Sequence, residues 1–359
     1  MSVLAGFSAE ARSADLKIGL SLPMTGNASV LAKQFLQGAR LAVEDFAPDG
    51  GVALVVADDG CEETAAELAA VDLKAAGIAI ATGYLCNTAA FASARGMRST
   101  GVPILVAGAR SERLLKDRAK EKWNVWRMAP SDREAAERAA QKLSVRWRGR
   151  PWAVVDDGTA FGRTFADDFR ALMEEAGQPP QFADNFRPAQ STQAGLVRRL
   201  QRSGVSAVFV AANAEDVAVI ADGMRQAGAS FELAGGPTLD LLPWIEQADV
   251  IPNGLLAVIE PDPASLDTAR ELTNKLAARE IEPEPYVYLG YAALEIAITA
   301  ARADPAEATK MLADSVFHTV LGNVDFDGAG RNRLNPYRLR IWQDGAFRPV
   351  TQEPAESPQ

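Results

Sequence analysis

The chain has 359 residues, of which 48% are hydrophobic, and its formal net charge at pH 7 is −10. This length and apolar content are enough for two hydrophobic cores, so two α/β lobes are predicted. The acidic balance argues against a nucleic-acid partner, and the single histidine, His318, argues against His-rich metal sites and most histidine-based catalysis. No apolar run in the sequence is long enough to span a membrane.

The first fourteen residues differ in character from the rest. A short apolar stretch at 3–7 precedes Ala11-Arg12-Ser13-Ala14, a small-residue pattern typical of signal-peptidase cleavage sites. A basic segment and a longer apolar segment are missing. Residues 1–14 are therefore interpreted either as a signal-peptide remnant whose start lies upstream or as a disordered N-terminus. The tail at 351–359, which carries Pro and Glu, is predicted to be disordered.

From residue 15 onward, short apolar runs alternate with amphipathic segments, as is typical of parallel sheets with crossover helices. In the first half, strands are predicted at 16–22, in the apolar runs that begin at 52 and 78, and at 102–107 and 123–127, with helices at 29–46, between the two apolar runs, at 89–98 and at 131–147. In the second half, strands are predicted at 151–155, 207–211, 231–234, 254–259 and 337–342, and helices at 163–176, 192–203, 216–227, 267–279 and 287–301, with a loop-and-strand closure at 320–328. The repeated cycle predicts an α/β protein with two doubly wound parallel-sheet lobes that face each other across a cleft.

Residues 52–86 form a predicted strand–helix–strand unit with parallel strands buried on both faces. Such crossovers are right-handed, so the carboxyl ends of both strands emerge at one edge of the sheet. Cys61 and Cys86 follow these strand ends and are predicted to lie on adjacent strands. A disulfide between them would be worth about 3 kcal/mol, whereas two buried free thiols are the alternative in a reducing compartment. Because open α/β sheets bind ligands at this edge, the site is expected here.

Two Asp-Asp-Gly runs, at 58–60 and 156–158, each follow a predicted strand. Their carboxylates could bind Mg²⁺ for phosphoryl chemistry, but the two runs lie in different lobes, which favours turns and helix caps instead. The sequence contains neither a Gly-x-Gly-x-x-Gly nor a Walker motif. The chain is therefore predicted not to be an enzyme, and no cofactor or metal is expected.

A set of short segments recurs along the chain in a characteristic order: 17–26 (KIGLSLPMTG), 37–43 (QGARLAV), 57–61 (ADDGC), 83–86 (GYLC), 127–132 (RMAPSD), 161–162 (FG), 291–293 (YAA) and 321–328 (LGNVDFDG). In their order and spacing, these segments resemble the type I periplasmic solute-binding proteins of ABC importers, specifically the leucine/isoleucine/valine-binding group. The resemblance extends from about residue 15 to residue 350, and no single motif is diagnostic.

The resemblance implies two lobes joined by a three-segment hinge. Lobe 1 would comprise 15–128 plus 260–333, and lobe 2 would comprise 129–259 plus 334–350. The implied protein is an exported, periplasmic, monomeric binding protein that closes around a small organic solute in the interlobe cleft and delivers it to an ABC permease in the inner membrane. Members of the group carry a disulfide where Cys61 and Cys86 stand, which supports export. The alternative is a ligand-sensing domain of the same fold, specific for an amide or an amino acid; a DNA regulator would need a headpiece longer than residues 1–14.

The resemblance also implies where the ligand binds, because ligand contacts in the family come from the loops at strand ends. Asn87 stands where the group usually has a serine that binds the ligand carboxylate, and Arg110 stands where it usually has threonine. Phe161 matches an aromatic residue, usually tyrosine, and Tyr286 matches an aromatic wall of the cleft. The full set of candidate ligand-binding residues is Asn87, Thr88, Gly108, Ala109, Arg110, Phe161, Asn213 and Tyr286.

Two departures from the group bear on the ligand. Leu31 stands where many members have tyrosine, and residues 236–238 contain no acid where the group usually meets the ligand ammonium; Asp240 would need a shift to serve. A buried ammonium without a partner is costly. A small organic acid is therefore favoured as the ligand, and branched-chain or other amino acids are the alternative.

Three of the candidate residues also have a purely structural interpretation. Asn87 could be a helix N-cap, a role that coexists with anion binding at a helix N-terminus. Arg110 could be a solvated loop charge, although its bidentate fork suits a carboxylate. Tyr286 could be an ordinary core residue.

Overall fold

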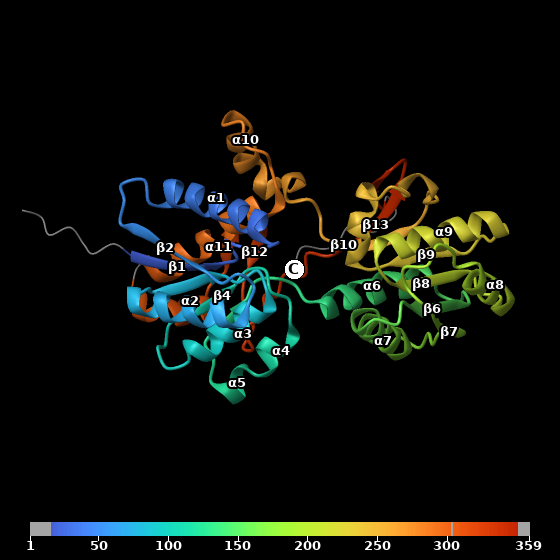
Figure 1. The fold of residues 1–359 in the computed structure, drawn as a ribbon, viewed down its shortest axis with the longest axis horizontal. Helices are drawn as coiled ribbons and strands as arrows, with labels where there is room; N and C mark the ends of the chain where they lie inside the picture. The colour runs from blue at the N-terminus through green and yellow to red at the C-terminus, as the bar shows by residue number, and fades with distance from the viewer. Residues whose placement is uncertain (1–15, 303, 351–359) are drawn as a thin grey trace, which may run out of the picture. The chain divides into compact units, whose positions relative to one another are not determined.

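A computed structural model describes residues 16–302 and 304–350, which form two compact units (Figure 1). Unit 1 comprises the described residues up to Ala129 together with Asp262–Leu334. Unit 2 comprises Pro130–Pro261 and the described residues from Asn335 onward. The chain thus passes between the units three times. The interpretations of residues 1–14 and of the tail at 351–359 lie outside the described residues.

Unit 1 is built on a parallel sheet of five strands in the order β2-β1-β3-β4-β5. The strands are β1 (Leu16–Leu22), β2 (Val52–Asp58), β3 (Ile80–Gly83), β4 (Ile104–Val106) and β5 (Val125–Arg127). Helices α1 (Ser29–Phe46) and α11 (Pro285–Arg302) pack on one face, and α2 (Glu63–Ala76) and α3 (Asn87–Gly96) on the other. Smaller elements complete the unit: α4 (Glu112–Lys116), α5 (Arg118–Glu121), η3 (Pro263–Ser265), η4 (Asp267–Ala269), α10 (Arg270–Ala278), η5 (Pro305–Glu307), α12 (Ala308–Asp314), β11 (Phe317–Thr319) and β12 (Gly322–Val324).

The strand order corrects two predictions about residues 52–86. β1 pairs with both β2 and β3, so the strands that precede the two cysteines are not adjacent. β2 is an edge strand and most of its residues are partly exposed, so it is not buried on both faces as predicted. A strand–helix–strand unit fixes the handedness of its crossover but not how many strands the crossover passes over.

Unit 2 contains a sheet of seven strands in the order β14-β13-β10-β9-β8-β6-β7. The strands are β6 (Trp152–Asp156), β7 (Phe182–Asn185), β8 (Ala207–Ala211), β9 (Glu232–Gly235), β10 (Leu256–Ile259), β13 (Arg338–Gln343) and β14 (Ala346–Pro349). Helices α6 (Asp132–Arg146) and α7 (Ala160–Glu175) pack on one face, and α8 (Ala194–Ser203) and α9 (Ala214–Ala227) on the other, with the short helices η1 (Pro237–Trp244) and η2 (Ala248–Val250) after β9. The predicted α/β class with two parallel-sheet lobes is confirmed.

Three strands of unit 2 differ from the sequence-based expectation. β7 was not predicted, because its polar residues do not form an apolar run. β13, predicted as a strand of a parallel sheet, and the unpredicted β14 are antiparallel. The hairpin that joins β13 to β14 turns at Asp344 and Gly345, both with positive φ (49° and 80°). Asp-Gly between two strands is a strong hairpin signal, so the sequence contained the information needed to predict β14.

Unit 1 depends on a close approach of α1 and α11. A Cβ atom on Gly38 would lie 1.8 Å from the carbonyl oxygen of Val287, and one on Gly290 would lie 2.0 Å from that of Phe35. Glycine is therefore the residue that lets the two helix backbones approach each other. None of the helices in the described residues is long and apolar enough to cross a membrane.

We expect Gly38→Ala to lower the free energy of unfolding by about 2–3 kcal/mol, because the added methyl group collides with backbone rather than with a flexible side chain. Gly195→Ala in α8 is the control, since a Cβ there meets only Arg199 Nη1 at 3.6 Å. It should be neutral or stabilising by about 0.5–1 kcal/mol. Urea denaturation of both variants checks this, and equal midpoints would refute the close-packing interpretation.

Candidate functional site

The loops that follow β3 and β4 meet at the carboxyl edge of the unit 1 sheet. Asn87, the exposed first residue of α3, accepts a hydrogen bond from the backbone N–H of Ser111 through Oδ1 at 3.0 Å. Gly108 lies against Leu85, since a Cβ there would come within 3.0 Å of the Leu85 Cα. The structure therefore brings Asn87 and its exposed neighbour Thr88 next to the loop that carries Gly108, Ala109 and Arg110.

Tyr84 holds these two loops together, and sequence reasoning did not identify it. Its side chain is fully buried and its backbone is left-handed, with φ of 54°. Its N–H donates to the carbonyl of Ser21 at 2.8 Å, and its own carbonyl accepts from Ala109 N at 2.9 Å. A non-glycine residue held in this conformation stores strain of a kind that concentrates at functional sites.

The N-terminus of α3 can receive an anion. Cys86, not Asn87, occupies the N-cap position, and its side chain makes no capping hydrogen bond. The interpretation of Asn87 as the N-cap is therefore wrong, because the helix begins one residue earlier than that role requires. The first amide groups of an α-helix have no intrahelical partners, and the helix dipole adds positive potential there.

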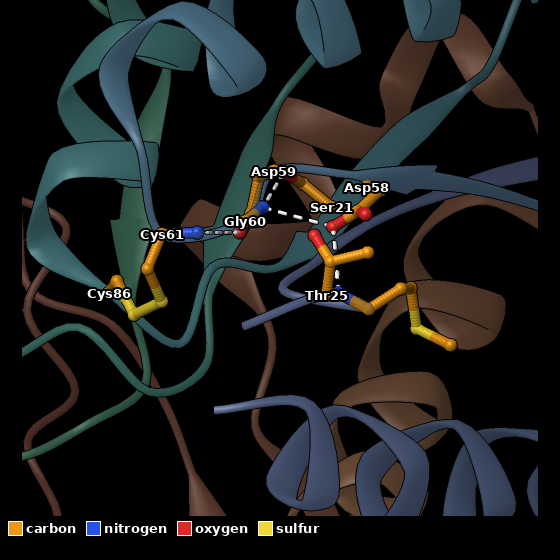
Figure 2. Close-up of a disulfide and its surroundings, with 8 residues drawn as sticks. Ser21, Thr25, Asp58, Asp59, Gly60, Cys61 and Cys86 are labelled. Atoms are coloured by element: carbon orange, nitrogen blue, oxygen red, sulfur yellow. Dashed lines mark hydrogen bonds between the residues drawn. A yellow bond between two sulfur atoms is a disulfide. The ribbon is translucent and has the colours of Figure 1, made fainter. Parts of the chain in front are cut away.

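The disulfide links this helix to the loop after β2 (Figure 2). Cys61 and Cys86 are bonded, with their Cα atoms 5.5 Å apart. Each cysteine lies beyond the end of its strand, in a loop, so the bond crosses the end of β1 rather than joining adjacent strands. The predicted pairing is confirmed, although the geometry expected for it was wrong. The bond fixes the N-cap residue of α3.

The first Asp-Asp-Gly run supports the same loops (Figure 2). Asp58 Oδ1 accepts from the backbone N–H groups of Met24, Thr25 and Gly60 at 2.8–3.3 Å. The fully buried Asp59 accepts from Ser21 Oγ at 2.8 Å and from Cys61 N at 3.0 Å. Burial raises the pKa of Asp59, and the neighbouring charge of Asp58 adds to that increase. Both carboxylates therefore serve turns.

The second Asp-Asp-Gly run plays the same part in unit 2. Asp156 Oδ1 accepts from Gly158 N at 2.8 Å, and Asp157 Oδ1 accepts from Thr159 N at 2.9 Å and from Thr159 Oγ1 at 2.6 Å. Within residues 16–302 and 304–350, no group of three or more His, Cys, Asp or Glu side chains could hold a metal ion. The hydrogen bonds of both runs confirm their interpretation as turns.

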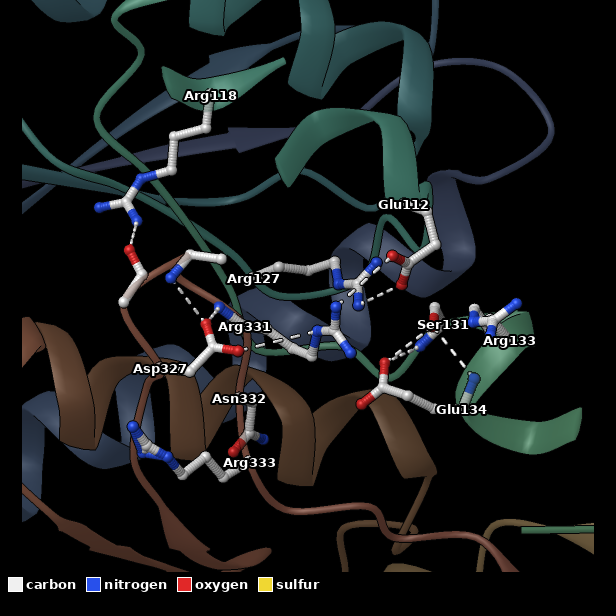
Figure 3. A network of polar contacts seen from close by, with 12 residues as sticks. Glu112, Arg118, Arg127, Ser131, Arg133, Glu134, Asp327, Arg331, Asn332 and Arg333 are labelled. Carbon is white, nitrogen blue, oxygen red and sulfur yellow. Dashed lines mark hydrogen bonds and ion pairs between the residues drawn. The ribbon is translucent and has the colours of Figure 1, made fainter. Parts of the chain in front are cut away.

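Arg127 and Glu112 form a buried ion pair at the start of α4 (Figure 3), and the same guanidinium positions the backbone of Arg110. The Arg127 side chain is 0% exposed; Nη1 donates to the Arg110 carbonyl at 3.1 Å, and Nη2 donates to Glu112 Oε1 at 2.9 Å. Arg331 approaches the same carboxylate, with Nη2 3.9 Å from Glu112 Oε2. The network joins the loop after β4 to β5 and to the segment that precedes Leu334. The Arg110 side chain itself is half-buried and has contacts of its own.

The candidate residues of unit 2 lie at the carboxyl ends of β6 and β8. Phe161, in the first turn of α7, is half-buried and stacks on Phe165, with ring centroids 5.7 Å apart and an interplanar angle of 8°. Asn213 is the N-cap of α9, where its Oδ1 accepts from Asp216 N at 2.8 Å. That carbonyl oxygen therefore already has a structural role.

Three observations concern Tyr286 and the segment around 236–240, where the resemblance implies that the group usually meets the ligand ammonium. Tyr286 is half-buried at the second position of α11 and does not belong to the loops that follow β3 and β4. The segment 236–238 offers no carboxylate, and Thr238 Oγ1 donates to the carbonyl of Ala212 at 2.6 Å. Asp240, the acid closest in sequence, is exposed in η1 and has contacts of its own.

Sequence reasoning missed two buried acids in unit 2. Asp157 is 4% exposed and Asp216 is 2% exposed. Asp216 Oδ1 accepts from Ala189 N at 2.8 Å, and burial together with the nearby Asp157 charge raises the pKa of Asp216. Asp157 was assigned to a turn, and Asp216 resembles any polar residue in a first helical turn, so their burial left no signal in the sequence.

The disulfide yields one prediction. Replacing both Cys61 and Cys86 by Ala should lower the free energy of unfolding by about 3 kcal/mol, because the cross-link restricts the unfolded chain. The wild-type protein should show no free thiol on titration in denaturant without reductant. Two titratable thiols in protein secreted to an oxidising compartment would contradict the bond.

The buried ion pair yields another. Glu112→Gln keeps an acceptor for Arg127 Nη2 but removes the adjacent negative charge, so unfolding should be easier by about 2 kcal/mol. Asp325→Asn is the control, since it removes the partner of the exposed Arg333 (Nη1–Oδ2 3.3 Å) in the same segment. That change should cost less than about 1 kcal/mol. Equal losses in denaturant unfolding would show that the burial of Arg127 is not decisive.

Comparison with known proteins places the chain in a family. Residues 15–346 match the periplasmic binding protein family. The Leu/Ile/Val-binding protein homolog 2 of Brucella abortus is 24% identical over 342 residues, which is 92% of this chain and 91% of that protein. Among solved structures, the ABC transporter substrate-binding protein of Desulfitobacterium hafniense in complex with Leu superposes with a TM-score of 0.75 at 22% identity, covering 94% of this chain and 100% of that one. A solute-binding protein of an ABC transporter from Rhodopseudomonas palustris in complex with p-hydroxybenzoic acid gives a TM-score of 0.70 at 16% identity, covering 93% and 95%. The chain therefore belongs to the periplasmic binding protein family, whose members bind solutes and are not enzymes.

Proposed function

We propose that this chain is the substrate-binding component of an ABC importer and that it binds a small organic carboxylate with an apolar or aromatic body. The observation that carries the ligand class is the meeting of the α3 N-terminus, at Asn87, with the loop that carries Arg110. Backbone N–H groups at a helix N-terminus and a guanidinium fork both favour a carboxylate. The disulfide, the buried ion pair and Tyr84 all hold this edge in place, as a binding surface requires.

The candidate residues offer fewer partners to a zwitterion than to an organic acid. In unit 2, the segment 236–238 has no carboxylate to receive an ammonium group, and Phe161 presents an aromatic ring. Burying an ammonium without a partner costs several kcal/mol. The p-hydroxybenzoic acid in complex with the R. palustris protein is an aromatic carboxylate of the kind proposed here.

Amino acids are the second candidate, and a specific observation favours them. Asp157 and Asp216 are buried carboxylates at the strand ends of unit 2 and could receive an ammonium group. The names of the B. abortus relative and of the D. hafniense complex refer to leucine. Asp216→Asn keeps an acceptor for Ala189 N and removes the charge, so it tests this alternative without removing the turn contact.

The importer role rests on the family rather than on the site geometry. We infer that the protein works in the periplasm and passes its ligand to an ABC permease in the inner membrane. The Cys61–Cys86 bond supports an oxidising compartment, where structural disulfides persist. A sensor domain of the same fold would bind ligand without supporting transport, so stimulation of a cognate permease's ATPase activity by the loaded protein distinguishes the two.

Thermal-shift measurements on ligand-stripped protein test the ligand class. Benzoate, p-hydroxybenzoate or branched 2-oxo acids should raise the Tm by mass action, and leucine or valine should not. Arg110→Ala should weaken binding of the responding acid by about 1.5–3 kcal/mol, the scale of a charge-assisted hydrogen bond. Arg148→Ala, which changes an exposed arginine of unit 2, is the control and should bind as wild type does.

The opposite pattern would contradict the organic-acid proposal. It would be overturned if leucine or valine alone stabilised the protein and Arg110→Ala bound them as tightly as wild type. If Asp216→Asn then abolished leucine binding, the ammonium partner would lie in unit 2 and the amino-acid alternative would hold.

A further inference from the structure

Unit 1 contains a cavity of about 830 Å³ whose lining residues do not come from the strand-end loops after β3 and β4. It lies between the C-terminal end of α1, the helices α10 and α11, and β11. None of the candidate residues Asn87, Thr88, Gly108, Ala109, Arg110 and Tyr286 lines it. Its volume falls within the range of cavities that hold small molecules. The side chains that concern its chemistry are Asp45, Phe46, Glu271, Lys275, Tyr291 and Glu295.

Glu295 is the unusual group in this cavity. Its side chain is 8% exposed, and Oε2 accepts a hydrogen bond from Val320 N at 2.9 Å. Within the described part of the chain, Oε1 has no hydrogen-bond partner. A carboxylate can accept several hydrogen bonds, and a buried one without a cation nearby is costly. A neutral amide would offer the same acceptor to Val320 N, so this hydrogen bond does not require the negative charge of Glu295.

The other charged groups of the cavity leave a negative balance. The Asp45 carboxylate pairs with the Lys275 ammonium and accepts from Tyr291 Oη at 2.7 Å. Glu271, exposed on α10, has no counterion among the described residues. With Asp45 and Lys275 cancelling, Glu271 and Glu295 remain, so the cavity favours a cation.

The wall beside these charges is aromatic. The Phe46 and Tyr291 rings pack edge to face, with centroids 6.1 Å apart and an interplanar angle of 65°. Aromatic faces attract organic cations and bury their apolar parts. A cavity lined by carboxylates and by aromatic rings suits a ligand that carries an ammonium group on a hydrocarbon body.

We propose that this cavity binds a small organic amine, whose ammonium group pairs with Glu295 and whose apolar part lies against Phe46 and Tyr291. The site is separate from the strand-edge site and does not depend on the function proposed for that site. It would give the protein a second ligand of opposite charge, bound by unit 1 alone.

The proposed pairing of the ligand ammonium with the Glu295 carboxylate makes binding of the amine pH-dependent. Burial, together with the charge of Asp45, raises the pKa of Glu295 to about 7, so the carboxylate needed for pairing forms between pH 6 and 8. The other titratable groups that face the cavity are Asp45 from α1, Glu271 and Lys275 from α10, Tyr291 from α11 and His318 from β11. Binding of an amine should strengthen about tenfold from pH 6 to pH 8, because roughly a tenth of Glu295 is ionised at the lower pH.

Isothermal titration calorimetry of ligand-stripped protein with butylamine tests the proposal. Wild type should bind butylamine at pH 8, and butanoate, of equal length and opposite charge, should not compete. Glu295→Gln keeps an acceptor for Val320 N and should weaken binding at least tenfold. Arg110→Ala, which alters the other site, should bind butylamine as wild type does.

The stability of Glu295→Gln also distinguishes a ligand-binding role from a purely structural one. If the Glu295 carboxylate only stabilised the fold, the variant would be less stable than wild type at pH 8. A raised folded-state pKa means that the contribution of Glu295 to stability is greatest below about pH 4.5 and is lost as pH rises towards 7. The variant should therefore have a higher Tm than wild type at pH 8, with the difference shrinking towards pH 5. Absence of butylamine binding to wild type, undiminished binding by Glu295→Gln or pH-independent binding would each overturn the proposal.

Discussion

The strand-edge site of unit 1 depends on one buried guanidinium. Arg127 lies on β5 with its side chain fully removed from water, a position that is tolerable only because Glu112 and the Arg110 carbonyl receive its N–H groups. Its backbone is also bound on both sides: Arg127 N donates to Gly330 O and Asn332 N donates to Arg127 O. One residue thus fixes the loop after β4, the start of α4 and the segment that leads to Leu334 (Figure 3).

The need of a buried charge for a partner of opposite charge also distinguishes acids that the fold itself pairs from acids that indicate a ligand. Burial by itself raises the pKa of Glu232, but hydrogen bonds from Arg146 and Trp147 and the Arg146 charge outweigh it, so the pKa of Glu232 is lowered. The Glu232 carboxylate therefore has its partners within the fold. Among residues 16–302 and 304–350, no cation pairs with Glu295, so burial prevails and the pKa of Glu295 is raised. The half-buried Glu232 and the buried Glu295 therefore have opposite protonation preferences, and the arginine and tryptophan beside Glu232 account for much of the difference.

The sequence predicted those local features of the fold that depend only on residues close together in the chain, such as helix caps and turns. The Ser131–Glu134 capping box begins α6 within the segment expected to cap that helix, and both Asp-Asp-Gly runs form the turns that their composition favours. Features that depend on distant residues were not readable. The insertion of β1 between β2 and β3, the antiparallel pairing of β13, and the use of the Asn213 side chain as a cap are results of packing.

The sequence by itself determined that this is a two-lobed α/β binding protein, because periodicity, turn residues and the order of family segments can be read along the chain. The structure was needed to decide that Cys61 and Cys86 are bonded rather than free. The tertiary structure alone decided which charges are buried and what they face. In the sequence, Arg127, Asp216 and Glu295 look like any surface charge, yet each is more than nine-tenths buried. Burial depends on which elements cover a residue, and the energy of a charge depends on its surroundings far more than on its position in the chain.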